Sequence, residues 1–154
     1  MTKRLGQVLA LAGVVTLLAS CGGSSSGGSG PVNTAPGFYI TIKNLSYSPA
    51  ELDVPPGATV TVVNQDAMQH SVTSEATPGS FTPAAVAGVQ FDTGLFTGQM
   101  QFTIPAGATN GTVIPYFCTL HKGLMNTPNA TIKIDDTAQP GPAPGAGGGG
   151  GGGY

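Results

Sequence analysis

The chain has 154 residues and a formal net charge of −2, with five Lys and Arg against seven Asp and Glu. No basic stripe is present, which argues against nucleic acid as a partner. The 25 glycines and 13 prolines would suggest disorder if they were spread evenly, but glycine is concentrated in residues 22–30 and 141–153. The remaining middle of about a hundred residues is apolar-rich, enough for one domain with a modest core and no disulfide.

The N-terminus has the pattern of an export signal. Lys3 and Arg4 form a short positive region, an uncharged apolar stretch follows, and small residues lead to Cys21. The uncharged stretch 5–20 is shorter than the roughly 20 residues that a membrane-spanning helix needs, which disfavours a retained anchor. Residues 18–21, Leu-Ala-Ser-Cys, resemble a bacterial lipobox. The resemblance implies a signal peptide over 1–20 and an exported protein, lipid-anchored through Cys21 to a bacterial membrane and facing the periplasm or the cell surface.

Removal of the signal peptide would leave three lysines against seven carboxylates, a formal net charge of −4. Residues 21–36 then form a lipidated cysteine and a flexible Gly/Ser tether between the lipid and the domain. With Cys21 lipidated, Cys118 is the one free thiol in an oxidising setting. An unpaired cysteine there needs an explanation, which a metal bond would supply.

Residues 37–136 form the predicted domain, and its pattern is β throughout. Short β-branched segments alternate apolar with polar residues and end at Pro/Gly turns, which favours an all-β sandwich. The expected strands are 38–42, 52–54, 58–64, 100–104, 112–118 and 130–134. One helical turn is expected over 83–89, and the stretch 74–99 is expected to cross between the sheets with a pairing that the pattern does not give. The Gly/Pro-rich tail 137–154 is expected to be disordered.

Three metal-capable side chains lie within eight residues: Cys118 at the end of a predicted strand, His121 three residues later, and Met125 four beyond that. The only other histidine, His70, lies upstream. Each of these residues alone is more often structural than a ligand, but the set is hard to reach by chance. Two imidazoles, a thiolate and a weak axial thioether form the donor set of blue-copper electron carriers. Zinc could bind the two imidazoles and the thiolate, but a thioether is a poor fourth donor for it.

Three segments, residues 54–66, 70–72 and 116–121, resemble the cupredoxin family, in particular its plastocyanin, pseudoazurin and amicyanin branch. The resemblance extends over roughly residues 40–134. It implies a Greek-key β-sandwich that holds one type 1 copper ion, cycling between Cu(I) and Cu(II), near one end. It matches His70, Cys118 and His121 to the family's strong ligands and Met125 to the axial methionine, although the interval from His121 to Met125 differs from that of plastocyanin and amicyanin.

The resemblance also implies a hydrogen bond beside the site and a surface for redox partners. The residue after the first histidine, Ser71, is expected to bond to the residue after the cysteine, Thr119. The edge of His121 is expected to reach the surface inside an apolar rim of Pro55, Ala67, Leu120 and Leu124. The chain would then be a monomer that shuttles single electrons between protein partners, and its negative charge would favour partners with basic patches.

Competing functions can be compared on the same residues. A copper redox enzyme needs a second centre with further histidines, and none remain, so the chain is not expected to be an enzyme. A copper carrier or buffer is the alternative, but carriers expose Met- and His-rich clusters for exchange, whereas a thiolate anchored on a strand favours retention. A structural or adhesive sandwich with coincidental ligands is the third reading.

Overall fold

The computed structural model describes residues 35–125 and 129–145. The predicted signal peptide, Cys21 and most of the predicted tether lie outside these residues. Within the described ranges no helix is long and apolar enough to cross a membrane. Those ranges hold the strands β1 (Phe38–Lys43), β2 (Ser46–Ser48), β3 (Glu51–Val54), β4 (Thr59–Asn64), β5 (Thr73–Ser74), β6 (Gly98–Thr103), β7 (Val113–Phe117) and β8 (Ala130–Ile134).

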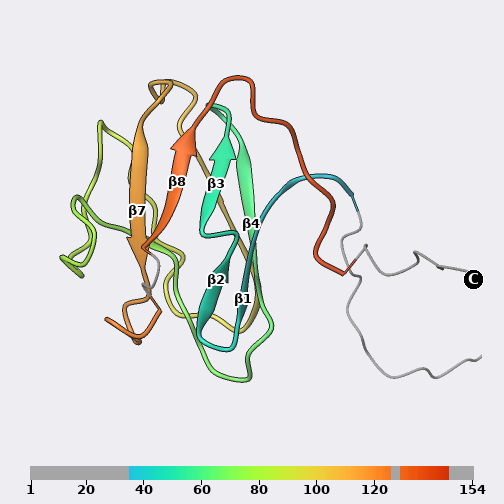
Figure 1. The fold of residues 1–154 in the computed structure, drawn as a ribbon, viewed down its shortest axis with the longest axis vertical. Coiled ribbons are helices and arrows are strands. Elements are labelled where there is room, and N and C mark those ends of the chain that lie inside the picture. The colour runs from blue at the N-terminus through green and yellow to red at the C-terminus, as the bar shows by residue number, and fades with distance from the viewer. Residues whose placement is uncertain (1–34, 126–128, 146–154) are drawn as a thin grey trace, which may run out of the picture. The chain divides into compact units, whose positions relative to one another are not determined.

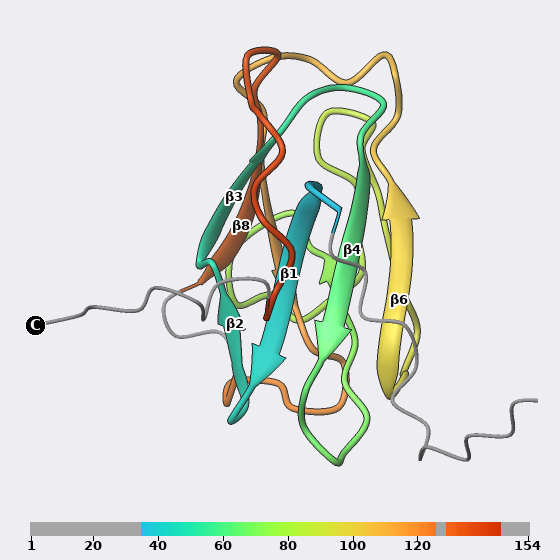
Figure 2. The ribbon, with the colours of Figure 1, turned by 90° about the vertical axis from the view of Figure 1, so that its right-hand side faces the viewer.

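The strands form two four-stranded sheets, in the orders β2-β1-β4-β6 and β3-β8-β7-β5 (Figures 1 and 2). Two pairs are parallel, β1 with β4 and β3 with β8, and the others are antiparallel. A parallel pair cannot be closed by a hairpin, so the chain must cross between the sheets. The predicted all-β sandwich is confirmed.

All six expected strands are present, with ends that agree to within two residues. Two strands were missed, β2 and β5, because segments of three and two residues are too short to show an alternating pattern. The prediction of a helical turn over residues 83–89 is wrong. Val86 and Val89 bond to each other's backbone in both directions at 2.9 Å, across Ala87 and Gly88 with φ of 47° and 81°. Two positive φ angles in succession are typical of a tight hairpin turn.

The poorly patterned stretch 74–99 does cross from one sheet to the other, since β5 and β6 belong to different sheets. It is held by isolated pairings rather than by a long strand: Glu75 with Pro83, Thr73 with Asp92, and His70 with Phe96. The last of these pairings places the crossing segment beside the first histidine.

The beginning of the predicted tail is ordered, so the boundary expected at residue 137 is too early. Gly141 and Gly37 bond to each other's backbone in both directions at 2.9 Å, and the Ala143 side chain is buried. Figure 2 shows this red segment returning alongside β1. These residues show no strand pattern in the sequence, so their return to the start of β1 was not predicted.

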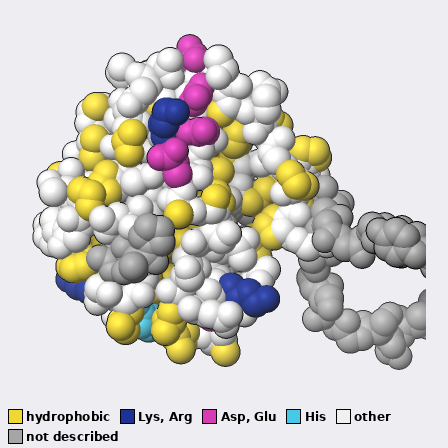
Figure 3. All heavy atoms as spheres, in the orientation of Figure 1, with side chains coloured by type: hydrophobic (Ala, Val, Ile, Leu, Met, Phe, Trp, Pro, Cys, Tyr) yellow, Lys and Arg dark blue, Asp and Glu magenta, His cyan; other side chains and the backbone are white. Residues whose placement is uncertain are grey.

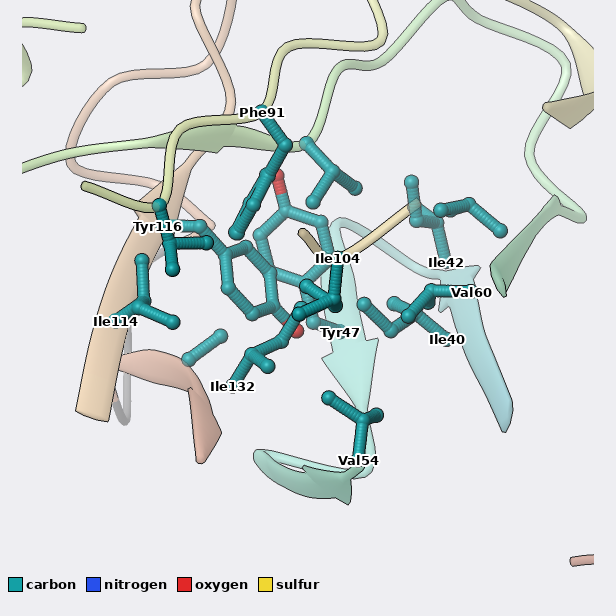
Figure 4. Packing of buried hydrophobic residues seen from close by; sticks show 14 of the residues in the cluster. Ile40, Ile42, Tyr47, Val54, Val60, Phe91, Ile104, Ile114, Tyr116 and Ile132 are labelled. Atoms are coloured by element: carbon teal, nitrogen blue, oxygen red, sulfur yellow. The ribbon is translucent and has the colours of Figure 1, made fainter. Parts of the chain in front are cut away.

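The core lies between the sheets and is built from the inward-facing residues of both (Figure 4). Each fully buried aliphatic or aromatic side chain contributes about 1.5–3 kcal/mol of hydrophobic stabilisation. Two tyrosines stand among these residues: the rings of Tyr47 and Tyr116 meet edge to face, with centroids 4.9 Å apart. Cys118 and Met125 belong to the same buried cluster, so both proposed sulfur ligands are part of the packed core.

Candidate metal centre

The two ligand segments meet at one end of the sandwich because they follow strands that end there. His70 lies in the loop after β4, and its backbone N–H and C=O both bond to Phe96, at 3.1 and 2.9 Å. Cys118 directly follows β7 and continues its inward-facing alternation with Ile114 and Tyr116. His70 thus lies on the connection that leads from one sheet to the other, and Cys118 follows a strand of the second sheet, so the spacing of the donors depends on how these segments pack.

Three donor atoms converge at this end. Nδ1 of His70 lies 3.1 Å from Nδ1 of His121, and the Sγ of Cys118 lies 3.6 Å from the His121 nitrogen and 3.9 Å from the His70 nitrogen. His70 and Cys118 are 0% and 1% exposed, whereas His121 is partly exposed. Bonds of about 2.0 Å to nitrogen and about 2.3 Å to sulfur are usual for a first-row metal ion. These separations fit one such ion between the three atoms.

Met125 returns to the core after a tight turn. The N–H groups of Leu124 and Met125 both donate to the His121 carbonyl, at 3.0 and 3.3 Å, and Gly123 has a φ of 77°, which favours glycine. The Met125 side chain is buried in the same cluster as Cys118. The interval of three residues between His121 and Met125 therefore suffices to bring the thioether inward.

Ser71 makes the contacts that join the two ligand segments. Its N–H donates to the Cys118 Sγ at 3.4 Å, and its Oγ accepts the Thr119 N–H at 2.9 Å. The same Oγ lies 3.1 Å from the hydroxyls of Thr119 and Thr73. The structure thus places Ser71 and Thr119 in the contact that the resemblance implied, and it adds a donor to the sulfur.

The carboxylate of Asp66 orients His70. Oδ2 lies 3.1 Å from Nε2 of the imidazole, so a proton on Nε2 leaves the lone pair of Nδ1 facing Cys118 and His121. The carboxylate also accepts the N–H groups of Asn44 at 2.7 Å and Leu45 at 3.0 Å, in the turn between β1 and β2. Sequence reasoning missed this role, although a carboxylate four residues before a metal-binding histidine is a usable signal.

The protonation states favour metal binding. Burial lowers the pKa of His70, and His121 nearby lowers it further, against the opposing effect of Asp66. The hydrogen bonds from the backbone of Leu45 and Asn44, with a smaller contribution from His70, hold the pKa of Asp66 below its usual range. At neutral pH the pair is therefore a neutral imidazole beside a carboxylate, and the neutral imidazole is the form that binds metal.

Tyr47 reaches the site from β2, which the sequence did not predict. Its phenol donates to the Ser71 carbonyl at 2.6 Å. Burial raises the pKa of Tyr47, and Cys118 and Tyr116 raise it further, so the phenol stays protonated and remains a donor. The contact spans 24 residues of sequence and could not be foreseen without the pairing of β1 with β2.

A short loop buttresses the ligand strand from the other side. Glu75 is buried, and its carboxylate accepts the N–H groups of Gly79 and Phe81 at 2.9 and 2.7 Å and the Ser80 hydroxyl at 3.1 Å. The Phe81 ring meets Phe117 edge to face, with centroids 5.8 Å apart. The buried carboxylate thereby holds the loop against the residue that precedes Cys118.

Apolar side chains surround the exposed part of the site. Leu120 and Leu124 are 54% and 67% exposed, and Ala67 is exposed on the loop before His70. Met68 and Leu95, which sequence reasoning did not include, are also exposed on loops at this end. Figure 3 shows a histidine among hydrophobic side chains at one end of the face, with the acidic side chains gathered at the other. Of the two histidines, His70 is fully buried and His121 is the partly exposed one.

Pro55 does not belong to this rim, and that part of the prediction is wrong. Pro55 precedes β4 and His70 follows it, so the six residues of the strand separate them. At a rise of about 3.3 Å per residue this is roughly 20 Å. The Val-Pro-Pro-Gly segment forms the turn at the far end of the sandwich.

A two-sheet β domain with two imidazoles and one thiolate converging at one end is a small metalloprotein of the β-sandwich class. Residues 38–133 match the model of the family described as copper binding proteins, plastocyanin/azurin family. The chain belongs to this family, and copper is the metal of its site. The cupredoxin identity and the Greek-key sandwich expected from the sequence are thereby confirmed.

Solved structures of amicyanin are similar to the chain. A reduced Cu(I) form of an amicyanin mutant at pH 4 is 22% identical and aligns with a TM-score of 0.47 over 64% of this chain and 82% of that one. A reduced tryptophan-to-tyrosine mutant is 23% identical, with a TM-score of 0.48 over 67% and 87% of the two chains. No curated protein matches the sequence.

Proposed function

We propose that the chain is a mononuclear type 1 copper protein that shuttles single electrons between protein partners outside the cytoplasm. The observation that carries this proposal is the convergence of His70 Nδ1, His121 Nδ1 and Cys118 Sγ within 3.1–3.9 Å of one another at the buried end of the sandwich. These three atoms are the proposed strong ligands, and Met125 is the proposed axial ligand.

The protein's contribution is a set of donors that is already in place. When bound, copper supplies a one-electron couple, and imidazole, thiolate and thioether together suit both of its oxidation states. Because His70 is held by Phe96 and Asp66, and Ser71 donates to Cys118, the donor spacing resists change when the charge at the site changes. Asp66 holds the tautomer of His70, and Ser71 donates to the sulfur, so the surrounding hydrogen bonds set the electron affinity of the site.

The exposed apolar rim is the proposed docking surface for redox partners. It consists of Ala67, Met68, Leu95, Leu120 and Leu124 around the exposed edge of His121. Electron-transfer complexes use small and weakly bound interfaces, and a rim of scattered apolar side chains suits such an encounter. Partners with basic patches would associate faster at low salt because the processed chain is negative.

The proposed location rests on the N-terminal sequence. The charged, apolar and small-residue pattern ahead of Cys21 supports export and lipidation, with the domain held near a bacterial membrane. Incorporation of labelled palmitate into the full chain, compared with Cys21→Ala, tests this. Labelling of both proteins or of neither would remove the lipid anchor from the proposal.

Two features support electron transfer over catalysis or copper delivery. Both histidines of the sequence lie in the one site, so the chain offers no imidazoles for a second copper centre. The thiolate is 1% exposed, which disfavours the easy ligand exchange that a carrier needs.

The test is the visible absorption and EPR spectrum of the full chain loaded with Cu(II), beside Cys118→Ser. We expect an intense blue band and a narrow copper hyperfine splitting in the parent, both lost in the variant. A colourless protein, or an ordinary tetragonal copper signal that the variant retains, would contradict type 1 copper and favour a plain copper carrier.

A further inference from the structure

The backbone of Ser71 has an unusual set of partners for a buried residue. His70 before it bonds to Phe96 through the main chain, and Val72 after it bonds to Thr93. In the described part of the chain, Ser71 itself has no main-chain partner: its N–H donates to Cys118 Sγ, and its C=O accepts from Tyr47. The N–H and C=O of Ser71 therefore bond to one sulfur atom and one phenol, between two neighbours that are held by other segments.

The bond from the phenol is short. The O–H···O distance is 2.6 Å, at the short end of the range for such bonds, and the N–H···S distance is 3.4 Å. Tyr47 is itself fixed, because β2 pairs with β1 and its ring packs edge to face on Tyr116. A rigid strand thus determines where the Ser71 carbonyl points.

We propose that Tyr47 is a positioning residue for the copper site: by holding the Ser71 carbonyl, it fixes the N–H···S contact on Cys118 and so tunes the electron affinity of the bound metal. The inference rests on the proposed type 1 site. The Tyr47 phenol donates to the Ser71 carbonyl and also lies beside Cys118, so it is placed to act on the sulfur through Ser71 and from its own position.

The direction of the effect follows from the charge on the thiolate. A hydrogen bond to sulfur withdraws electron density from it, which makes the sulfur a poorer donor to the oxidised metal. Loss of the phenol leaves the buried Ser71 carbonyl without its partner, and the backbone shifts to find another. The N–H···S contact then weakens, the thiolate donates more strongly, and the oxidised state is favoured.

The experiment compares Tyr47→Phe with Tyr116→Phe in the full chain. The two tyrosines share one core and contact each other, but the Tyr116 hydroxyl is buried with no hydrogen-bond partner within the described structure. Both changes remove one oxygen and keep the ring. Only the first removes the donor to Ser71, which also lies beside Cys118, so Tyr116→Phe is the matched control, and the exchange of the Ser71 amide reports on the contact to Ser71.

Three readouts are taken: the reduction potential, the energy of the sulfur-to-copper absorption band, and hydrogen exchange of the Ser71 amide in the metal-free protein. In Tyr47→Phe we expect a lower potential, with the redox equilibrium moved about threefold to tenfold toward the oxidised state, as for the loss of one ordinary hydrogen bond. A tenfold change corresponds to about 59 mV for a one-electron couple. The band should shift, and the Ser71 amide should exchange faster. Tyr116→Phe should leave all three unchanged.

Equal readouts for the two variants and the parent would overturn the proposal. If Tyr47→Phe does not fold, a fluorinated tyrosine placed at position 47 is used, because fluorine makes the phenol a stronger donor; the potential should then rise, and an unchanged potential would overturn the proposal. The amide exchange is measured without metal. A parent that lacks the blue band would therefore contradict the proposed function, while the exchange result would still decide whether Tyr47 holds Ser71.

Discussion

Replacement of Asp66 by Ala should weaken both the metal site and the fold. The carboxylate accepts three hydrogen bonds, two from the turn at Asn44 and Leu45 and one from His70 Nε2. Bonds to a charged acceptor contribute about 1.5–3 kcal/mol each when buried. Asp66 lies at the rim of the domain with its side chain 14% exposed, so water can replace part of each bond. We therefore expect a loss of about 2 kcal/mol of unfolding free energy.

The effect on copper should exceed the effect on stability. Without the carboxylate, nothing fixes the proton on Nε2, and His70 can present the wrong tautomer to the metal. Loss of such a partner typically costs about tenfold to a hundredfold in metal affinity. Affinity is measured by competition with a chromogenic chelator, and stability by urea unfolding of the metal-free protein.

Asp135→Ala provides the control. Asp135 also caps a turn, accepting the N–H and hydroxyl of Thr137 at 2.9 and 2.7 Å, but it follows β8 at the end of the sandwich away from the site. This variant should retain the parent's copper affinity. An Asp66→Ala protein with the parent's affinity would refute the tautomer argument, and equal losses in both variants would show that the effect comes from the fold alone.

Three further predictions follow from the same structure. Burial lowers the pKa of His70 below 6.5, and hydrogen bonds lower that of Asp66 below 3.8. At acidic pH the unfolded chain therefore binds more protons than the folded protein. The metal-free protein should lose stability as pH falls below about 6.5, where His70 begins to titrate in the unfolded chain. A urea midpoint that is flat between pH 7 and 5 would contradict this. Glu75→Ala should cost about 3 kcal/mol in urea unfolding because it leaves three donors without their acceptor; an unchanged midpoint would show that the loop is not held by it. Leu124→Asp should slow electron transfer to a protein partner about tenfold, or about 1.4 kcal/mol. Met100 is exposed on β6 away from the site, so Met100→Asp should leave the rate unchanged. Equal stopped-flow rates for the two variants would remove Leu124 from the docking surface.

The donor atoms could be predicted from the sequence because their residue types are rare in this chain. The chain has two histidines and two cysteines, and one of the cysteines lies in the predicted lipidation motif, so the possible sets were few; the close spacing of Cys118, His121 and Met125 gave local information. The long alternating strands were predictable for the same reason, since their pattern repeats within one short window. Both features depend on local sequence alone.

The contacts that could not be predicted from the sequence depend on pairing between distant segments. Tyr47 could not be connected to Ser71 without the register of β2 on β1, and β2 is too short to be visible as a strand. The error at Pro55 has the same origin: its motif resembles the family, but only the direction of β4 shows which end of the sandwich it occupies. Contacts between distant segments need the three-dimensional arrangement.

The bonds between Gly37 and Gly141 bring the two ends of the folded domain together on the side where β1 begins. The turn capped by Asp66 comes after β1, a strand length of roughly 20 Å away. A surface or fusion partner attached at either end would thus lie at the end of the domain opposite the copper site. The exposed edge of His121 would then face away from that surface or partner. Joining the two ends with a short linker and opening the chain elsewhere should likewise yield a circularly permuted protein that still binds copper.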